Sequence, residues 1–125
     1  MLNFSKKTKF KLESPLGTII GNNTTFKGSI DSQEMIRIDG TFEGDITTAS
    51  DLIVGSTGIV NAQIKAKNAI ISGTITGNAD IEDKIHIMQN ARFYGDIKST
   101  NLIIEEGAFF KGSNAVKNDN LQDNE

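Results

Sequence analysis

Small residues recur down this chain at a nearly constant interval, and this repetition constrains the fold more than any other feature. Every 15 to 18 residues a glycine or alanine appears, with a large apolar residue two positions before it. The small residues are Gly28, Gly44, Ala62, Gly77, Gly95 and Gly112, and the apolar ones are Phe26, Phe42, Val60, Ile75, Phe93 and Phe110. A period of about 17 residues is too short for a helical hairpin or a propeller blade, but it fits one coil of a β-solenoid. We therefore expect the apolar residues to form one core column.

A second pattern, of apolar residues two positions apart, sets the register of the coils. Such pairs recur every 16 or 17 residues: Ile36/Ile38, Leu52/Val54, Ala69/Ile71, Ile85/Ile87 and Leu102/Ile104. Alternation with period two indicates a β-strand, and both members of a pair should face the core. The residue between them should face outward. Three isoleucines at that position, Ile53, Ile70 and Ile103, indicate an outer wall that is partly covered or adhesive.

Glycine-containing steps connect the inward positions of successive strands. Asp39-Gly40 and Ser72-Gly73 stand in the short steps, and we expect their glycines to adopt the positive φ that a tight corner requires. In the longer steps we expect the same of Gly55, Gly58, Asn90 and Gly107. The column of small residues is expected to form a second corner, where a larger side chain would collide with the neighbouring coil.

One coil departs from the pattern. After Gly77 the expected isoleucine arrives two residues late, at Ile81. The repeat therefore leaves the register between Gly77 and Ile81 open.

Length and patterning indicate one structured domain between two unpatterned ends. We expect a flexible membrane-binding arm over residues 1–15, the solenoid over 16–113, and a disordered polar tail over 114–125. The chain contains no cysteine, which excludes a disulfide framework and thiolate metal sites and fits a reducing cytoplasm. It has no apolar run of the roughly 18 residues that mark a membrane-spanning helix, and its lysine-rich start is unlike a signal peptide.

Neither end of the predicted ladder has a recognisable cap, so both end coils should expose unpaired backbone groups. An open strand edge with apolar residues beneath it is a template for another copy of the same rod. The expected interface residues are Ile19, Ile20 and Phe26 in the first coil, and Leu102, Ile104 and Phe110 in the last. The alternative is a monomer, or a closed dimer, whose ends are covered by its own tails.

The first residues combine apolar side chains with lysines that follow closely. They are Met1, Leu2 and Phe4, then Lys6, Lys7 and Lys9. Apolar residues backed by cations are typical of a weak peripheral membrane anchor, which many joined copies would strengthen. The alternative is a solvated basic leader without a role. The whole chain has a net charge of −3 although its arm is positively charged, so the rest of the chain is acidic. An acidic body argues against nucleic acid as a partner.

The run from Ile36 to Ile46, Ile-Arg-Ile-Asp-Gly-Thr-Phe-Glu-Gly-Asp-Ile, resembles the signature of the bactofilins. Thr-Ile-Ile-Gly at 18–21 and Leu-Ile-Ile-Glu-Glu-Gly-Ala-Phe-Phe-Lys-Gly at 102–112 support the resemblance, which covers residues 16–113 and the leader. It implies an all-β fold, a right-handed parallel β-helix of about six coils.

The resemblance also implies a function. Bactofilins are bacterial cytoskeletal proteins that assemble without nucleotide into non-polar filaments, bind the inner face of the cytoplasmic membrane and position cell-wall enzymes. The implied partners are further copies of the chain, membrane lipids, and peptidoglycan synthesis or hydrolase proteins. The apolar residue of the family's last coil that is important for assembly corresponds to Phe110, through its Gly-Ala-x-Phe-x-Gly setting. We expect no enzyme activity, no cofactor and no metal site.

Other functions fit a β-solenoid of this sequence less well. A left-handed hexapeptide-repeat acyltransferase needs a histidine base, and a carbonic anhydrase of that fold needs three histidines on zinc. This chain has His86 alone, at an outward strand position. A calcium-binding β-roll needs a nine-residue aspartate motif, which is missing. An ice-binding or adhesive solenoid needs an unbroken rank of threonines, whereas only Thr41 and Thr74 recur.

Overall fold

A computed structural model describes residues 15–117, and all the regular secondary structure in that range is β-strand. Strands of four or five residues alternate with strands of eight residues. The short strands are β1 (Leu16–Ile20), β3 (Met35–Ile38), β5 (Asp51–Val54), β7 (Asn68–Ile71), β9 (Lys84–Ile87) and β11 (Asn101–Ile104). The long strands are β2 (Thr25–Ser32), β4 (Thr41–Thr48), β6 (Ile59–Ala66), β8 (Thr74–Ile81), β10 (Arg92–Ser99) and β12 (Phe109–Val116). Each short strand and the long strand that follows it form one coil, numbered 1 to 6 along the chain.

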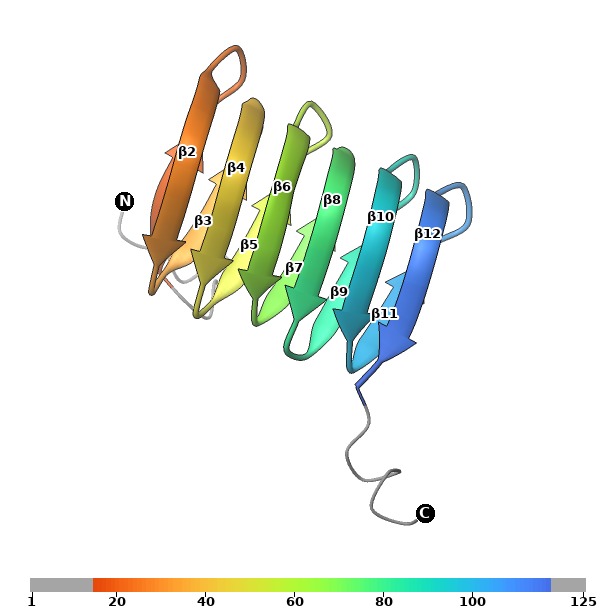
Figure 1. The fold of residues 1–125 in the computed structure, drawn as a ribbon. Helices are drawn as coiled ribbons and strands as arrows, with labels where there is room; N and C mark the ends of the chain where they lie inside the picture. Colours follow the sequence, from red (N-terminus) through yellow and green to blue (C-terminus); the bar gives the residue numbers. More distant parts are fainter. Residues whose placement is uncertain (1–14, 118–125) are drawn as a thin grey trace, which may run out of the picture.

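The strands form two six-stranded parallel sheets, named here the short-strand sheet (β1-β3-β5-β7-β9-β11) and the long-strand sheet (β2-β4-β6-β8-β10-β12). Each strand pairs only with the equivalent strand of the coils next to it. In Figure 1 the chain runs down each long strand in front, crosses to a short strand behind, runs up it and advances one coil to the right. This path is right-handed. The predicted parallel β-helix of about six coils is confirmed.

The core lies between the two sheets, where inward side chains stack in columns. The expected column from Phe26 to Phe110 is in register from β2 to β12. Its four middle members, Phe42, Val60, Ile75 and Phe93, are buried. The inward pairs of the short strands form two further columns in the same way. Burying each large apolar side chain contributes about 1.5–3 kcal/mol, so these columns are the main source of stability.

The sequence left the register of coil 4 open, and in the structure β8 pairs with both neighbouring strands without a shift. Ala79 pairs with Ile64 on one side and with Ile97 on the other, and the late Ile81 pairs with Ala66. Coils 3 and 4 therefore exchange the positions of a large and a small inward side chain. All of these side chains are buried, so the exchange preserves the filled volume of the core.

The column of small residues does not form the separate corner that we expected. The long strands continue through it, and Gly44, for example, pairs with Gly28 in β2 and Ala62 in β6. The five glycines of the column have φ between 138° and 150°. Because the glycines of neighbouring coils lie side by side and share this positive φ, with Ala62 as the exception, the strands stay paired through the column. The steric expectation holds, because a Cβ on Gly44 would overlap the carbonyl oxygen of Gly28.

The glycines of the short steps do not have the positive φ that we expected. Gly40 and Gly73 are required for space instead. A Cβ on Gly40 would overlap the carbonyl oxygens of Gly21 and Thr24 in the coil before it. A Cβ on Gly73 would overlap backbone oxygens in the same way.

The longer steps agree only in part with the expectation. Asn90 has φ 71° and Gly107 has φ 93°, as expected, whereas Gly55 and Gly58 do not have positive φ. Asn23, which was not among the expected turn residues, has φ 69°. Asparagine tolerates this conformation because its short polar side chain can form local hydrogen bonds.

The last strand extends beyond the expected end of the solenoid at residue 113. Asn114, Ala115 and Val116 continue β12 and pair with Ile97, Lys98 and Ser99 of β10. Their side chains are exposed, so these three positions lack the alternation of buried apolar and exposed polar residues by which a strand is recognised in a sequence. Backbone pairing with β10 continues through all three residues. The expected arm and tail otherwise lie outside the described residues.

We expect Gly44→Ala to lower the free energy of unfolding by more than about 2 kcal/mol, because the methyl group would both overlap the neighbouring coil and require a strained φ. Gly21→Ala is the matched control, since a Cβ there has no atom within 4 Å. Urea unfolding followed by circular dichroism at one protein concentration measures both. Equal unfolding midpoints for the two variants would show that the close approach of the coils does not limit side-chain size.

Candidate assembly surfaces

The inward columns of the rod end at coil 6 in apolar side chains that are exposed or only partly buried. Ile104 continues the column of Ile87 and is 43 % exposed, whereas Ile87 is fully buried. Leu102 continues the column of Ile85, and Phe110 continues that of Phe93; both are only partly buried. The ring of Phe110 lies 5.9 Å from that of Phe93, tilted by 53°. These three side chains form what we call the C-terminal surface.

The backbone of the end coils is also open. At the ends of both sheets, β1, β2, β11 and β12 each pair on one side only within the described chain. Each therefore presents a row of N–H and C=O groups to whatever adjoins it. Figure 1 shows these strands as the outermost elements of the rod. Apolar side chains and free backbone groups thus occur together at each end.

At the other end the arrangement is less open. Phe26 stacks on Phe42 with a ring distance of 5.1 Å and an interplanar angle of 10°, and it is partly buried. Ile20 is only 5 % exposed, so our expectation that it contributes to an exposed interface is wrong. Its side chain faces inward, in register with Ile38, and is part of the core. Ile19 is exposed, but it lies in the outward column beside Arg37.

A contact that sequence reasoning missed ties coil 6 to coil 4. Lys117 follows β12, and its N–H donates to the Ser99 carbonyl oxygen at 2.7 Å. Its ammonium group donates a hydrogen bond to the carboxylate of Asp80 in β8, with Nζ and Oδ1 2.5 Å apart. This hydrogen bond lowers the pKa of Asp80, against the opposing effect of desolvation, and the charges of Lys117, Lys98 and Lys65 lower it further.

We expect Asp80→Asn to speed amide hydrogen exchange in β12, because the link to coil 4 is weakened. Exposed ion pairs contribute less than about 1 kcal/mol, so the effect should be local. The folded-state pKa of Asp80 is depressed, so its stabilisation is present above the unfolded value of about 3.9. It is lost as the pH falls through the folded pKa, and there the variant and the parent should converge.

Asp45→Asn is the control for this measurement, because Asp45 lies in β4, far along the rod from β12. Hydrogen exchange of β12 peptides, followed by mass spectrometry, compares each variant with the parent at the same pH. Identical exchange in β12 for the parent and Asp80→Asn above pH 4 would contradict the role given to this pair.

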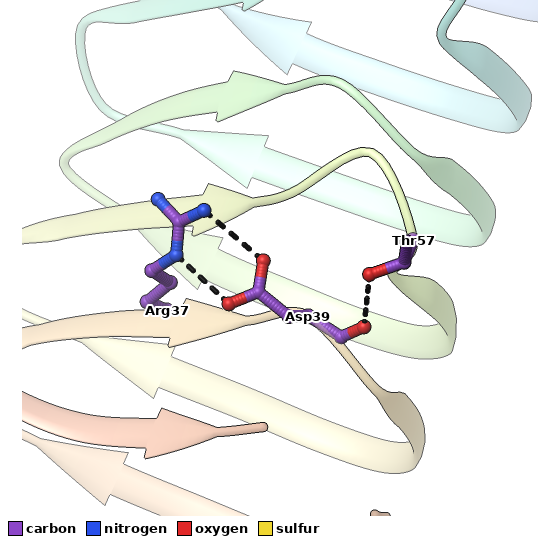
Figure 2. Close-up of polar contacts among 3 residues, drawn as sticks. All are labelled: Arg37, Asp39 and Thr57. Atoms are coloured by element: carbon purple, nitrogen blue, oxygen red, sulfur yellow. Dashed lines mark hydrogen bonds and ion pairs between the residues drawn. The ribbon is translucent and has the colours of Figure 1, made fainter. Parts of the chain in front are cut away.

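The outer wall of the short-strand sheet is held by polar contacts at the ends of its strands. Arg37 donates two hydrogen bonds to the carboxylate of Asp39, at 2.9 and 3.1 Å. The hydroxyl of Thr57, one coil further on, donates to the Asp39 carbonyl oxygen at 2.7 Å. Figure 2 shows the three residues, with Asp39 between the other two. A Cβ at Gly55 would overlap the Asp39 carboxylate, so the glycine leaves room for the pair.

His86 lies at an outward position on the same wall, as expected. Its Nε2 is 2.9 Å from Oε2 of Glu105 on the next coil. Among residues 15–117 there is no group of three or more histidine, cysteine or acidic side chains that could hold a metal ion.

An exposed aromatic cluster on the long-strand sheet was also missed. Tyr94 and Phe109 have ring centroids 5.5 Å apart, and the guanidinium of Arg92 lies 5.8 Å from the centre of the Phe109 ring. Arg92 and Phe109 are in register on neighbouring strands. The repeat could have revealed this pairing, since each residue stands immediately before a member of the core column.

The expected membrane-binding residues lie outside the described chain. They are Met1, Leu2, Phe4, Lys6, Lys7 and Lys9. Within the described range, no helix has the length and apolar composition that crossing a membrane would take.

Comparison with known proteins places these features in a family. Residues 18–115 match the family model described as "Bactofilin: Polymer-forming cytoskeletal". Bactofilin BacO of Myxococcus xanthus is 35% identical over 111 residues, which is 87% of this chain and 88% of BacO. Bactofilin BacP of the same organism is 34% identical over 95 residues, which is 76% of this chain and 40% of BacP.

The fold agrees with a solved filament. The cryo-EM reconstruction of Thermus thermophilus bactofilin double helical filaments matches with a TM-score of 0.75 and 31% identity. The match covers 80% of this chain and 99% of that one. The chain belongs to the bactofilin family of polymer-forming cytoskeletal proteins.

Proposed function

We propose that this protein is a non-enzymatic scaffold that assembles end to end, without nucleotide, into non-polar filaments. The filaments lie on the inner face of the cytoplasmic membrane and position proteins that build or cleave peptidoglycan. The observation that supports assembly most directly is the C-terminal surface. There, the columns whose members are buried in coils 2–5 end in coil 6 with Ile104 exposed and with Leu102 and Phe110 only partly buried.

End-to-end contact would complete both kinds of interaction that the end coils leave open. A second rod would cover Leu102, Ile104 and Phe110, and the burial of their apolar area is favourable at about 25 cal/mol per Å². Strand edges β11 and β12 would gain backbone partners, each worth about 0.5–1.5 kcal/mol. Neither contribution involves a bound nucleotide. The double helical filaments of the Thermus relative support assembly as the function.

We expect Phe110→Arg to abolish filaments while leaving the β-helix folded. In a single rod the arginine can extend its charged group into water, but at a junction the charge would be buried without a partner. Negative-stain microscopy reports filaments, and circular dichroism reports the fold.

Phe109→Arg is the matched control, because the neighbouring Phe109 is 44 % exposed and contacts Tyr94 on the outer face. It should still form filaments. Filaments of normal length from Phe110→Arg, or equal loss of filaments in both variants, would place the junction elsewhere.

Membrane attachment is proposed for residues 1–9, where three apolar residues precede three lysines. Each lysine near an anionic surface contributes about 1 kcal/mol, so a single arm binds weakly. A filament presents many arms at high effective concentration and would bind firmly. Firm attachment to the membrane therefore requires both the arm and the end-to-end junction.

We expect deletion of residues 1–9 to prevent flotation of the protein with vesicles that contain anionic lipid. The variant Leu2→Ser/Phe4→Ser keeps every lysine and should reduce flotation, because the apolar part of the anchor is lost. Flotation is preferred to pelleting, since filaments pellet without vesicles. Unchanged flotation of the deletion variant would show that the arm is not the anchor.

A further inference from the structure

The outward residues at the centre of the short strands form a straight stripe along the rod. Each is in register with the next from β1 to β11. We call this row the outer stripe; its members are Ile19, Arg37, Ile53, Ile70, His86 and Ile103. Ile70 is 41 % exposed, and Ile19 and Ile103 are exposed as well. An aligned row of large apolar side chains on a solvent-facing wall is typical of an interaction surface.

The order of residue types in the outer stripe is the same from either end: apolar, basic, apolar, apolar, basic, apolar. Consider two copies packed wall to wall, related by a two-fold axis parallel to the strands and midway between β5 and β7. Coil 3 of one copy then opposes coil 4 of the other, coil 2 opposes coil 5, and coil 1 opposes coil 6. Ile53 meets the second copy's Ile70, and Ile19 meets its Ile103. The surface is therefore complementary to itself, as a two-fold contact requires.

The charges of the stripe also suit this arrangement. Arg37 is hydrogen-bonded to Asp39, and His86 to Glu105, within each copy. Each basic group thus carries its own carboxylate into the contact. Burying the stripe would therefore leave neither the Arg37 guanidinium nor the His86 ring without a partner, which is the condition for such groups to be tolerated in an interface. A partner of unrelated sequence would give no reason for the symmetric order.

We propose that the outer wall of the short-strand sheet is a lateral contact between two antiparallel copies of this chain, centred between Ile53 and Ile70. The wall is small: six strands about 4.8 Å apart and about 13 Å long present roughly 370 Å². A stable interface buries about 800 Å² on each partner. Single rods would therefore pair weakly, and filaments would pair firmly through many repeated contacts. In this respect the inference rests on the proposed end-to-end assembly.

The width of filaments under the electron microscope tests this contact. Ile70→Lys places a charge at the centre of the stripe and should give single-stranded filaments, where the parent chain gives paired ones. Ile59→Lys is the matched control, because Ile59 is 55 % exposed on the long-strand sheet and should leave pairing unchanged. Parent-like width in Ile70→Lys, or equal narrowing in both variants, would overturn the proposal. If Ile70→Lys filaments keep the parent width but no longer float with vesicles, the wall binds lipid and not a second copy of the chain.

Cross-linking tests the orientation, and the absence of cysteine from the chain makes single-cysteine variants clean. Arg37→Cys and His86→Cys proteins, treated with a short bismaleimide, should form several-fold more cross-linked dimer when mixed than either forms alone. In the antiparallel contact these two positions face each other, whereas identical positions are offset by three coils, about 14 Å. Cross-linking within each variant alone, or none in the mixture, would contradict the antiparallel contact.

The same experiment separates this inference from the proposed function. With Phe110→Arg added to both cysteine proteins, end-to-end junctions are blocked, and the mixture at high protein concentration should still cross-link. If the parent chain forms no filaments but these rods cross-link only as a mixture, end-to-end assembly is wrong and the lateral contact stands. If the parent chain forms filaments but no cross-linked dimer appears, the lateral contact is wrong and end-to-end assembly stands.

Discussion

In-register parallel pairing between successive coils is the interaction on which the rest of this structure depends. It stacks residues of one kind, so that Phe42 lies between Phe26 and Val60 and the glycine column lies beside it. A single coil has too few residues to bury its own apolar face, and each coil therefore needs a neighbour on both sides. Coils 1 and 6 have one neighbour each. Their incomplete burial follows from the repeat itself, without any special feature of the end sequences.

The sequence was sufficient to predict the number of coils, the core columns and the outward stripe, because a repeat of about 17 residues displays the register directly. Backbone conformation was harder to predict. Gly40 and Gly73 look like turn glycines but serve close packing, and Gly44 lies within a strand at a φ of 138°. A glycine in a sequence does not distinguish a need for space from a need for positive φ, since both exclude a side chain.

The candidate surfaces were predictable where they continue a column and not where they depend on contacts between distant residues. Leu102, Ile104 and Phe110 followed from the last repeat. Ile20 is buried although it belongs to an end coil, and the contact between Lys117 and Asp80 joins residues 37 positions apart. No periodic pattern contains such a contact, because Lys117 comes after the last repeat.

The exchange of large and small side chains between coils 3 and 4 has a consequence for how the chain finds its order. Near-identical repeats can mispair during folding, for instance when one coil is skipped and looped out. If coil 4 were skipped, Ala66 would lie beside Ser99, and no isoleucine would fill the space at that level. The resulting void would weaken the mispaired rod by the cost of an unfilled core position. Ala79 and Ile81 thus give coil 4 an identity of its own, and the sequence of coils is encoded in the fit of their interiors.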